Sequence, residues 1–90
     1  MLVSVRPSDR KDKKYVATFD DGTKTHFGAK GMSDFTLHRD EERKARYIAR
    51  HRVNEDWTNP KSAGTLSRWI LWNKPTLDAS IKDFKKRFNL

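Results

Sequence analysis

The fold class is decided by the segment YVATFDDGTKTHF, residues 15–27. Its two flanks, residues 15–19 and 24–27, are rich in β-branched and aromatic residues, which favour strands. Between them Asp21-Gly22 suits a two-residue type I′ turn, because aspartate and glycine tolerate the positive φ that this turn requires. The segment therefore predicts an antiparallel β-hairpin.

A two-residue turn also predicts the register of the hairpin. It pairs Val16 with Phe27 and Thr18 with Thr25, and it places these four side chains on one face, which we expect to cover a core. The opposite face would carry Tyr15, Ala17, Phe19, Lys24 and His26.

The residues before the hairpin allow two interpretations. Residues 2–5, Leu-Val-Ser-Val, suit a third strand. The charged residues 9–14 suit a mobile linker, in which case residues 1–13 would form a flexible N-terminal arm. In residues 1–8 the basic residue follows the short apolar part, which is not the order of a secretory signal.

Helices are expected after the hairpin. Glycines in residues 28–31 break the second strand, and a first helix, capped by Asp34, Thr36 or Asp40, would run to about Arg52. A second helix would open at Asn59-Pro60 and end near Trp72, because asparagine is a good cap and proline is tolerated in the first turn.

The last helix has the cleanest pattern. Pro75-Thr76 supplies a stop and a cap, and Asp78 complements the helix dipole. Its apolar stripe consists of Leu77, Ile81, Phe84 and Phe88. We therefore expect an α+β fold in a single basic domain of residues 1–90, in which a small N-terminal antiparallel β-hairpin, with a third strand under one interpretation, packs on about three helices.

The first helix carries the strongest indication of function. Residues 43–52 hold five permanent positive charges and no acid, and they follow three acids at residues 40–42 that complement a helix N-terminus. Steps of about 100° per residue separate two sides. One side carries Arg43, Arg46, Tyr47 and Arg50, and the other carries Ala45, Ile48 and Ala49. Guanidinium groups with an aromatic ring among them suit phosphates or carboxylates.

The second helix departs from a simple amphipathic pattern. Leu71 and Trp72 lie opposite the apolar stripe that faces the core, and they flank Arg68. Either the helix is buried on both sides and all three tryptophans belong to the core, or Trp72 or Trp57 is exposed as an anchor for a partner, because Trp and Arg are enriched at binding hot spots. We expect partner or phosphate binding through Arg43, Lys44, Arg46, Tyr47, Arg50, Arg52, Arg68 and Trp72.

Composition limits the classes of function. The net charge is +8, with a positive excess at both ends and in the first helix, so the surface should attract polyanions, and salt should weaken that attraction. The chain has no cysteine, so it can form neither a disulfide nor a thiolate metal site. No apolar run approaches the length of a membrane span, and we expect none.

The residues for catalysis are poorly arranged. No two of the three histidines have the i, i+4 spacing of a helical zinc site. Ser67 lacks the glycine elbow of a serine nucleophile, and Asp20-Asp21 suit turn geometry better than acid and base chemistry. We therefore expect no enzymatic activity, no catalytic residue, no metal site and no cofactor.

An ordered set of motifs runs along the chain. It comprises Asp21-Gly22, Phe27-Gly28, Gly31-Met32-x-Asp34, Thr36-x-His38, residues 43–51, Asp56-Trp57, Ala63-Gly64-x-Leu66-Ser67-Arg68-x-Ile70-Leu71-Trp72, Pro75, Ser80 and Phe84-Lys85-x-Arg87-Phe88. Over about residues 14–88 the chain thereby resembles a family of short basic proteins of unknown function encoded by large nucleocytoplasmic double-stranded DNA viruses, including algal viruses. The resemblance implies a viral context and no catalytic residues.

Two functions follow as expectations. In the first, the protein is a non-enzymatic virion component, a minor capsid or cement protein whose arginine face and aromatic helix join other virion proteins. In the second, it binds nucleic acid, with the cations of the first helix on phosphates and Tyr47 or a tryptophan stacked on bases. A weaker third option is a module directed at a host protein. The protein would reside in the virion, or in the cytoplasm or nucleus of the infected cell, and its oligomeric state stays open.

Overall fold

The computed structural model describes residues 2–90; residue 1, the first of the stretch expected to form an arm, lies outside the described residues. The elements are β1 (Leu2–Pro7), β2 (Lys13–Phe19), β3 (Lys24–Ala29), α1 (Phe35–His38), α2 (Glu41–His51), α3 (Ala63–Leu66), η1 (Ser67–Leu71) and α4 (Leu77–Phe88). The strands form one antiparallel sheet in the order β1-β2-β3. The expected α+β class is confirmed, and the interpretation with a third strand is correct.

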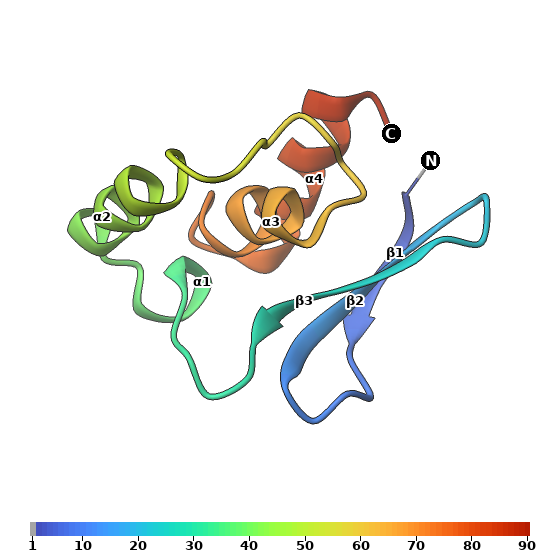
Figure 1. The fold of residues 1–90 in the computed structure, drawn as a ribbon, viewed down its shortest axis with the longest axis horizontal. Helices are drawn as coiled ribbons and strands as arrows, with labels where there is room; N and C mark the ends of the chain where they lie inside the picture. The colour runs from blue at the N-terminus through green and yellow to red at the C-terminus, as the bar shows by residue number, and fades with distance from the viewer. Residues whose placement is uncertain (1) are drawn as a thin grey trace.

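The sheet and the helices form layers (Figure 1). The α3 helix and its continuation η1 lie between the sheet on one side and α4 on the other. The short α1 and the longer α2 lie together at one end of the molecule, away from the free end of the hairpin. This arrangement leaves α2 exposed along most of its length.

The register of the hairpin differs from the prediction by one residue. Tyr15 pairs with Phe27 and Ala17 with Thr25. The turn has three residues, because the Phe19 N–H donates to the Thr23 carbonyl (2.9 Å) and Gly22 N–H donates to the Phe19 carbonyl (3.0 Å), with Gly22 at φ +89°. This is the type I turn with a left-handed third residue, the next most common hairpin connection after the two-residue turn.

The shift exchanges the two faces of β2, whereas Phe27 of β3 lies in the core as expected. Ala17, Phe19 and Phe27 are at most 1% exposed, whereas Val16 and Thr18, expected in the core, lie on the other face and are half-buried. A slip of one residue has this effect because side chains alternate between the faces of a strand.

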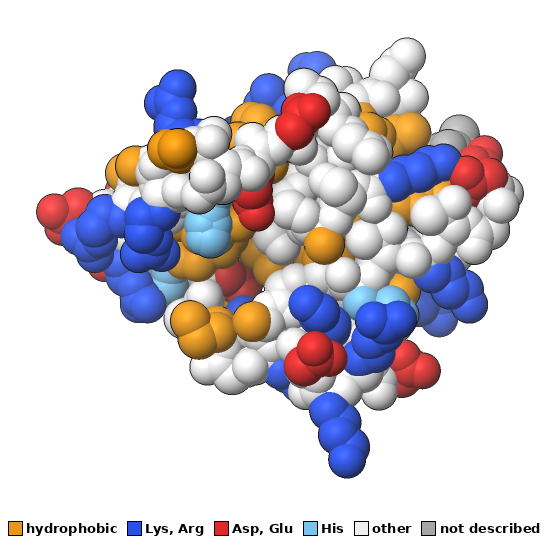
Figure 2. Space-filling model, viewed as in Figure 1, with side chains coloured by type: hydrophobic (Ala, Val, Ile, Leu, Met, Phe, Trp, Pro, Cys, Tyr) orange, Lys and Arg blue, Asp and Glu red, His pale blue; other side chains and the backbone are white. Residues whose placement is uncertain are grey.

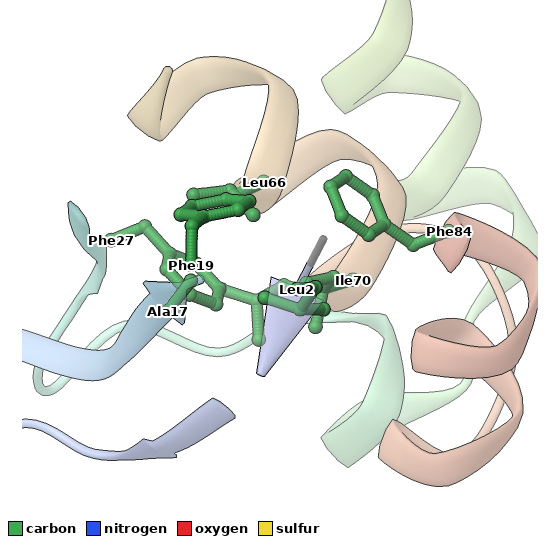
Figure 3. Close-up of a cluster of buried hydrophobic side chains, with 8 residues drawn as sticks. Leu2, Ala17, Phe19, Phe27, Leu66, Ile70 and Phe84 are labelled. Carbon is green, nitrogen blue, oxygen red and sulfur yellow. The ribbon is translucent and has the colours of Figure 1, made fainter. Parts of the chain in front are cut away.

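The core joins the three layers (Figure 3). Phe19 and Phe27 reach from the sheet, Leu66 and Ile70 from α3 and η1, and Phe84 from α4, and these side chains point toward one another. The cluster also contains Leu2, Ala17 and Leu71.

The region expected to hold the first helix contains two helices. Asp34 caps α1 by accepting the Thr36 N–H (2.9 Å), and Asp40 caps α2 by accepting the backbone N–H groups of Glu42 (3.0 Å) and Arg43 (3.3 Å). Between them Arg39 adopts a left-handed conformation at φ 53°, which ends α1. Two of the three candidate caps are therefore used, and Thr36 is not a cap.

The predicted start of the second helix is wrong. Ser62 caps α3 through the Thr65 N–H, and Asn59 instead closes a turn by accepting the Ser62 N–H (3.1 Å). In η1 the helix widens to a π turn, in which the Trp72 N–H donates to the Ser67 carbonyl five residues earlier (3.1 Å).

The wider turn explains the unusual apolar pattern of this helix. In it residue 71 lies nearly above residue 66, so Leu71 joins the core at 2% exposure. Leu71 packs against Gly28 of β3, where a Cβ atom would lie 2.7 Å from Leu71 Cδ1. The helix is thus buried on both sides between the sheet and α4, which agrees with the first of the two interpretations of its pattern.

The α4 helix follows its sequence pattern. Thr76 caps it by accepting the Ala79 N–H (3.2 Å), and Phe84 is fully buried. Leu77, Ile81 and Phe88 pack against the core. Ser80, which the pattern did not single out, is also buried and accepts the Lys74 N–H (2.9 Å), which fixes the loop before the helix.

Candidate anion-binding site

The α2 helix presents its cations outward. Its inward residues are Lys44, Tyr47, Ile48 and His51, of which Tyr47 is buried. Arg43, Arg46 and Arg50 are exposed. Tyr47 therefore lies on the inward side of α2, at the border of the arginine face. The helical period predicts it among the exposed arginines. The difference arises because the orientation of α2 against η1 decides which side of the helix is buried.

Tyr47 is the middle ring of a column formed by Trp72, Tyr47 and His51. Its ring stacks on Trp72 with centroids 4.3 Å apart and planes 5° apart, and on His51 with centroids 4.1 Å apart. Both faces of Tyr47 are thus covered, which rules out the expected stacking of a base on this ring. Burial, followed by the nearby Glu55 carboxylate, raises the pKa of Tyr47 above its usual value.

Two of the expected binding cations are used inside the molecule. The ammonium of Lys44 donates to the Asn73 carbonyl (2.8 Å) and lies 4.8 Å from the centroid of Phe35. The guanidinium of Arg68 donates to the Trp72 carbonyl (2.9 Å) and lies 4.0 Å from the centroid of Trp69. The Lys44 bond joins α2 to the segment after η1, whereas the Arg68 bond lies within η1 and its C-cap. Both cations are half-buried and bonded to the protein's own backbone, unlike the three exposed arginines of α2.

Arg68 also contacts the rings of the other two tryptophans. Its guanidinium lies 5.6 Å from the centroid of Trp57, and Arg87 lies 3.7 Å from the centroid of Trp69. Burial, and next the charge of Arg87, lower the pKa of Arg68. All three tryptophans are half-buried, so neither Trp57 nor Trp72 is the exposed anchor that the second interpretation of the helix pattern expected.

The three outward arginines line one hollow, which we call the arginine hollow. It has a volume of about 290 Å³, and its walls are Met32, Ser33, Arg43, Arg46, Arg50 and Trp72. No acidic side chain lines it. Figure 2 shows Lys and Arg side chains gathered over α2, with the surface hollowed beside them.

Within residues 2–90 none of the arginines of this hollow forms an ion pair with an acid. Among residues 2–90 the ion pairs join Lys14 to Asp34, Lys61 to Asp21, and Arg87 to Asp83. None of these involves α2. Arg52 is exposed directly after α2 and does not line the hollow, so it is separate from the other three arginines.

A second, larger pocket of about 350 Å³ continues from the hollow, and we call it the inner pocket. The two share Met32, Ser33, Arg50 and Trp72. The inner pocket extends between the start of β2, the end of β3 and the start of α3. Its polar walls include the buried pair Lys14–Asp34, whose charged atoms are 2.5 Å apart, together with His51 and Glu55.

Several lining residues were not among the expected binding residues, and Met32, Ser33 and Glu55 show why. Met32 and Ser33 follow the glycine turn after β3, which carries them across the hollow from α2, and Glu55 follows α2 and accepts the Trp57 indole N–H (2.8 Å). Their positions depend on how the loops fold back, which helical period does not encode.

In residues 2–90 no three His, Asp or Glu side chains lie together in a way that could hold a metal ion. Over the same residues no helix has both the length and the apolar character needed to cross a membrane.

The comparisons with known proteins identify a family without a described activity. The model of the family described as "Family of unknown function (DUF5754)" matches residues 3–51, which is more than half of the chain. The match includes β1 from its second residue, β2, β3, α1 and all of α2. No curated protein matches the chain. No solved structure matches it either.

Proposed function

The chain belongs to the DUF5754 family of unknown function, and we propose that it is a non-catalytic binding protein whose partner is nucleic acid. One observation carries the proposal. Three arginines of α2 line a single hollow that contains no acid, and none of them is paired with an acid among the described residues. Guanidinium groups in such a setting are suited to phosphate oxygens, which they bind in a forked geometry.

A continuation of the positive charge favours a polymer over a small acidic group. Lys13 lines the inner pocket and leads into the turn between β1 and β2, where Arg10 and Lys11 are exposed. Lys30 joins this turn, because its ammonium donates to the Arg10 carbonyl (3.3 Å). Cations thus flank the site on the side opposite α2 and can contact further phosphates of the same strand.

The proposal is tested by titrating a labelled oligonucleotide with the protein at several salt concentrations. We expect binding that weakens as salt rises, because each phosphate contact releases a counterion. Replacing Arg43, Arg46 and Arg50 with Gln should reduce the magnitude of the logarithmic salt slope by about 2 to 3.

The matched control is Arg6→Gln, which removes an exposed arginine of β1 that lines neither pocket. It should leave the slope within about 1 of the unmodified protein. A flat titration at low salt with both single-stranded and double-stranded oligonucleotides would refute the proposal.

A virion component is the second candidate. The resemblance to viral proteins supports it, and so do exposed apolar side chains on either side of α2 in the sequence, Leu37 at 67% and Val53 at 78% exposure. Leu71 does not add to this apolar surface, because it is 2% exposed. A mass-spectrometric inventory of purified particles, divided into shell and core fractions, tests it; absence from both fractions contradicts it.

A further inference from the structure

We infer that the arginine hollow and the inner pocket together form a site for a phosphomonoester of a nucleoside, with the phosphate in the hollow and the sugar and base in the inner pocket. The inference rests on the proposed function and makes it more specific. The ligand has two sources, a free nucleotide and the phosphorylated end of a nucleic acid strand.

The charge of the hollow matches a terminal phosphate. A phosphodiester inside a strand carries one negative charge, whereas a phosphomonoester carries about −1.5 to −2 at pH 7. Arg43, Arg46 and Arg50 span about 10 Å along the axis of α2, and all three line one hollow of about 290 Å³. Three positive guanidinium groups around one small space exceed the single negative charge of a diester, and they match the larger charge of a phosphomonoester better.

The acids of the site define the direction of the ligand. Asp34 and Glu55 line the inner pocket, and neither lines the arginine hollow. In the inner pocket the cations Lys13, Lys14 and Arg50 are accompanied by these two acids, whereas the hollow has three arginines and no acid. A phosphate is therefore attracted more strongly to the hollow than to the inner pocket. The neutral part of the ligand, which carries hydroxyl and amino donors, is left for the inner pocket.

Glu55 is the acceptor available to those donors. Both oxygens of Asp34 are occupied, one by Thr36 and the other by Lys14. Only Oε2 of Glu55 is bonded, to the Trp57 indole N–H (2.8 Å), and Oε1 accepts no hydrogen bond from residues 2–90. A sugar hydroxyl or an exocyclic amino group can donate to it.

The size of the site sets the length of the ligand. At about 350 Å³ the inner pocket lies at the low end of the range for small-molecule sites, so it holds one nucleoside and not a run of bases. Because Tyr47 is stacked on both faces, the base is held by polar groups at the wall and not by intercalation on this ring.

The inference is tested with two versions of one short single strand, one with a 5′-phosphate and one with a 5′-hydroxyl, in fluorescence anisotropy at fixed salt. We expect the phosphorylated strand, or AMP as competitor, to bind at least about tenfold more tightly than the hydroxyl strand or adenosine, because two or more charge-assisted hydrogen bonds are added. Displacement by AMP identifies a free nucleotide as a ligand. A preference for the phosphorylated strand without displacement by AMP identifies the strand end.

Three variants connect the result to the site. Arg46→Gln should abolish the preference for the phosphate, and Arg6→Gln should keep it. Glu55→Gln should reduce the advantage of AMP, or of the phosphorylated strand, over inorganic phosphate without changing the affinity for inorganic phosphate itself. We expect each variant to fold, because the replaced side chains are exposed. Circular dichroism of each variant checks this.

The outcomes separate the two proposals. If both strands bind equally and AMP does not compete, the inference fails and the proposed function stands. If neither strand nor AMP binds, both fail. If inorganic phosphate or a phosphoserine peptide competes as well as AMP and the phosphorylated strand, the assignment of the inner pocket to a nucleoside is overturned.

Discussion

The rings of Tyr47 and Trp72 stack nearly parallel, with centroids 4.3 Å apart and an angle of 5° between their planes. Tyr47 belongs to α2 and Trp72 ends η1, so this contact attaches the arginine-bearing helix to the body of the molecule. The Lys44 bond to the Asn73 carbonyl attaches the same two segments one turn away. The position of the arginine hollow thus depends on the ring stack.

Truncating Tyr47 should destabilise the protein. We expect Tyr47→Ala to lower the free energy of unfolding by about 3 kcal/mol, because the buried ring is lost and its two stacking partners are left without a neighbour. Tyr47→Phe keeps the ring and should change the value by less than about 1 kcal/mol. Urea denaturation measures both; equal losses in the two variants would show that the hydroxyl and not the stack matters.

The same residue should make the protein sensitive to alkali. Since burial raises the pKa of Tyr47, the folded state favours the protonated phenol. Its contribution to stability is complete below the ordinary tyrosine pKa of about 10 and is lost as pH rises from there toward the raised value. Stability measured from about pH 9 to 11 should therefore fall less steeply in Tyr47→Phe than in the unmodified protein. Parallel curves would contradict this.

Gly28 should tolerate alanine less well than Gly22. Both residues have positive φ, +78° and +89°, but only at Gly28 would a Cβ atom clash, at 2.7 Å from Leu71 Cδ1; at Gly22 it meets nothing within 4 Å. We expect Gly22→Ala to cost about 1 kcal/mol from backbone strain, and Gly28→Ala about 2 to 4 kcal/mol from strain and overpacking. Thermal or urea denaturation of the two variants decides, and equal costs would show that the contact with Leu71 relaxes freely.

Asp34 should contribute more to stability than Asp21, although both pair with a lysine. The side chains of Asp34 and Lys14 are 3% and 13% exposed, whereas those of Asp21 and Lys61 are 47% and 41% exposed. Asp34→Ala leaves a buried ammonium unpaired and removes the cap of α1, so we expect a loss of about 3 kcal/mol. Asp21→Ala breaks a solvent-screened pair, and its denaturation midpoint should move much less. A larger shift for Asp21→Ala would contradict the role of burial.

Local sequence patterns predict an element correctly where contacts with distant segments do not change its start or its register. The α4 helix begins at its predicted cap, Thr76, because cap, dipole and apolar stripe agree. The hairpin was found but its register was not, since Asp21-Gly22 suits both a two-residue and a three-residue turn, and the burial of Phe19 against α3 and η1 selects the second. The predicted start of α3 is wrong because Asn59 and Ser62 are both good N-caps, and in the folded protein Ser62 is the one that caps the helix.

The candidate site divides in the same way. Helical period correctly placed Arg43, Arg46 and Arg50 on one side of α2, and their exposure agrees with it. It could not distinguish them from Lys44 and Arg68, whose charges are held by the Asn73 and Trp72 carbonyls. Nor could it find Ser33 or Glu55, which reach the site only through the folding of loops.

The amino-acid sequence by itself determined the α+β class, the helix that carries the arginines and the excess of positive charge, because composition, periodicity and capping act over a few residues. The tertiary structure alone decided which cations remain free, which rings are covered and where a hollow opens beside α2. Those properties arise from contacts between segments distant in the chain, such as Tyr47 with Trp72 and Gly28 with Leu71, and a one-residue change in register or a widened helical turn is enough to rearrange them.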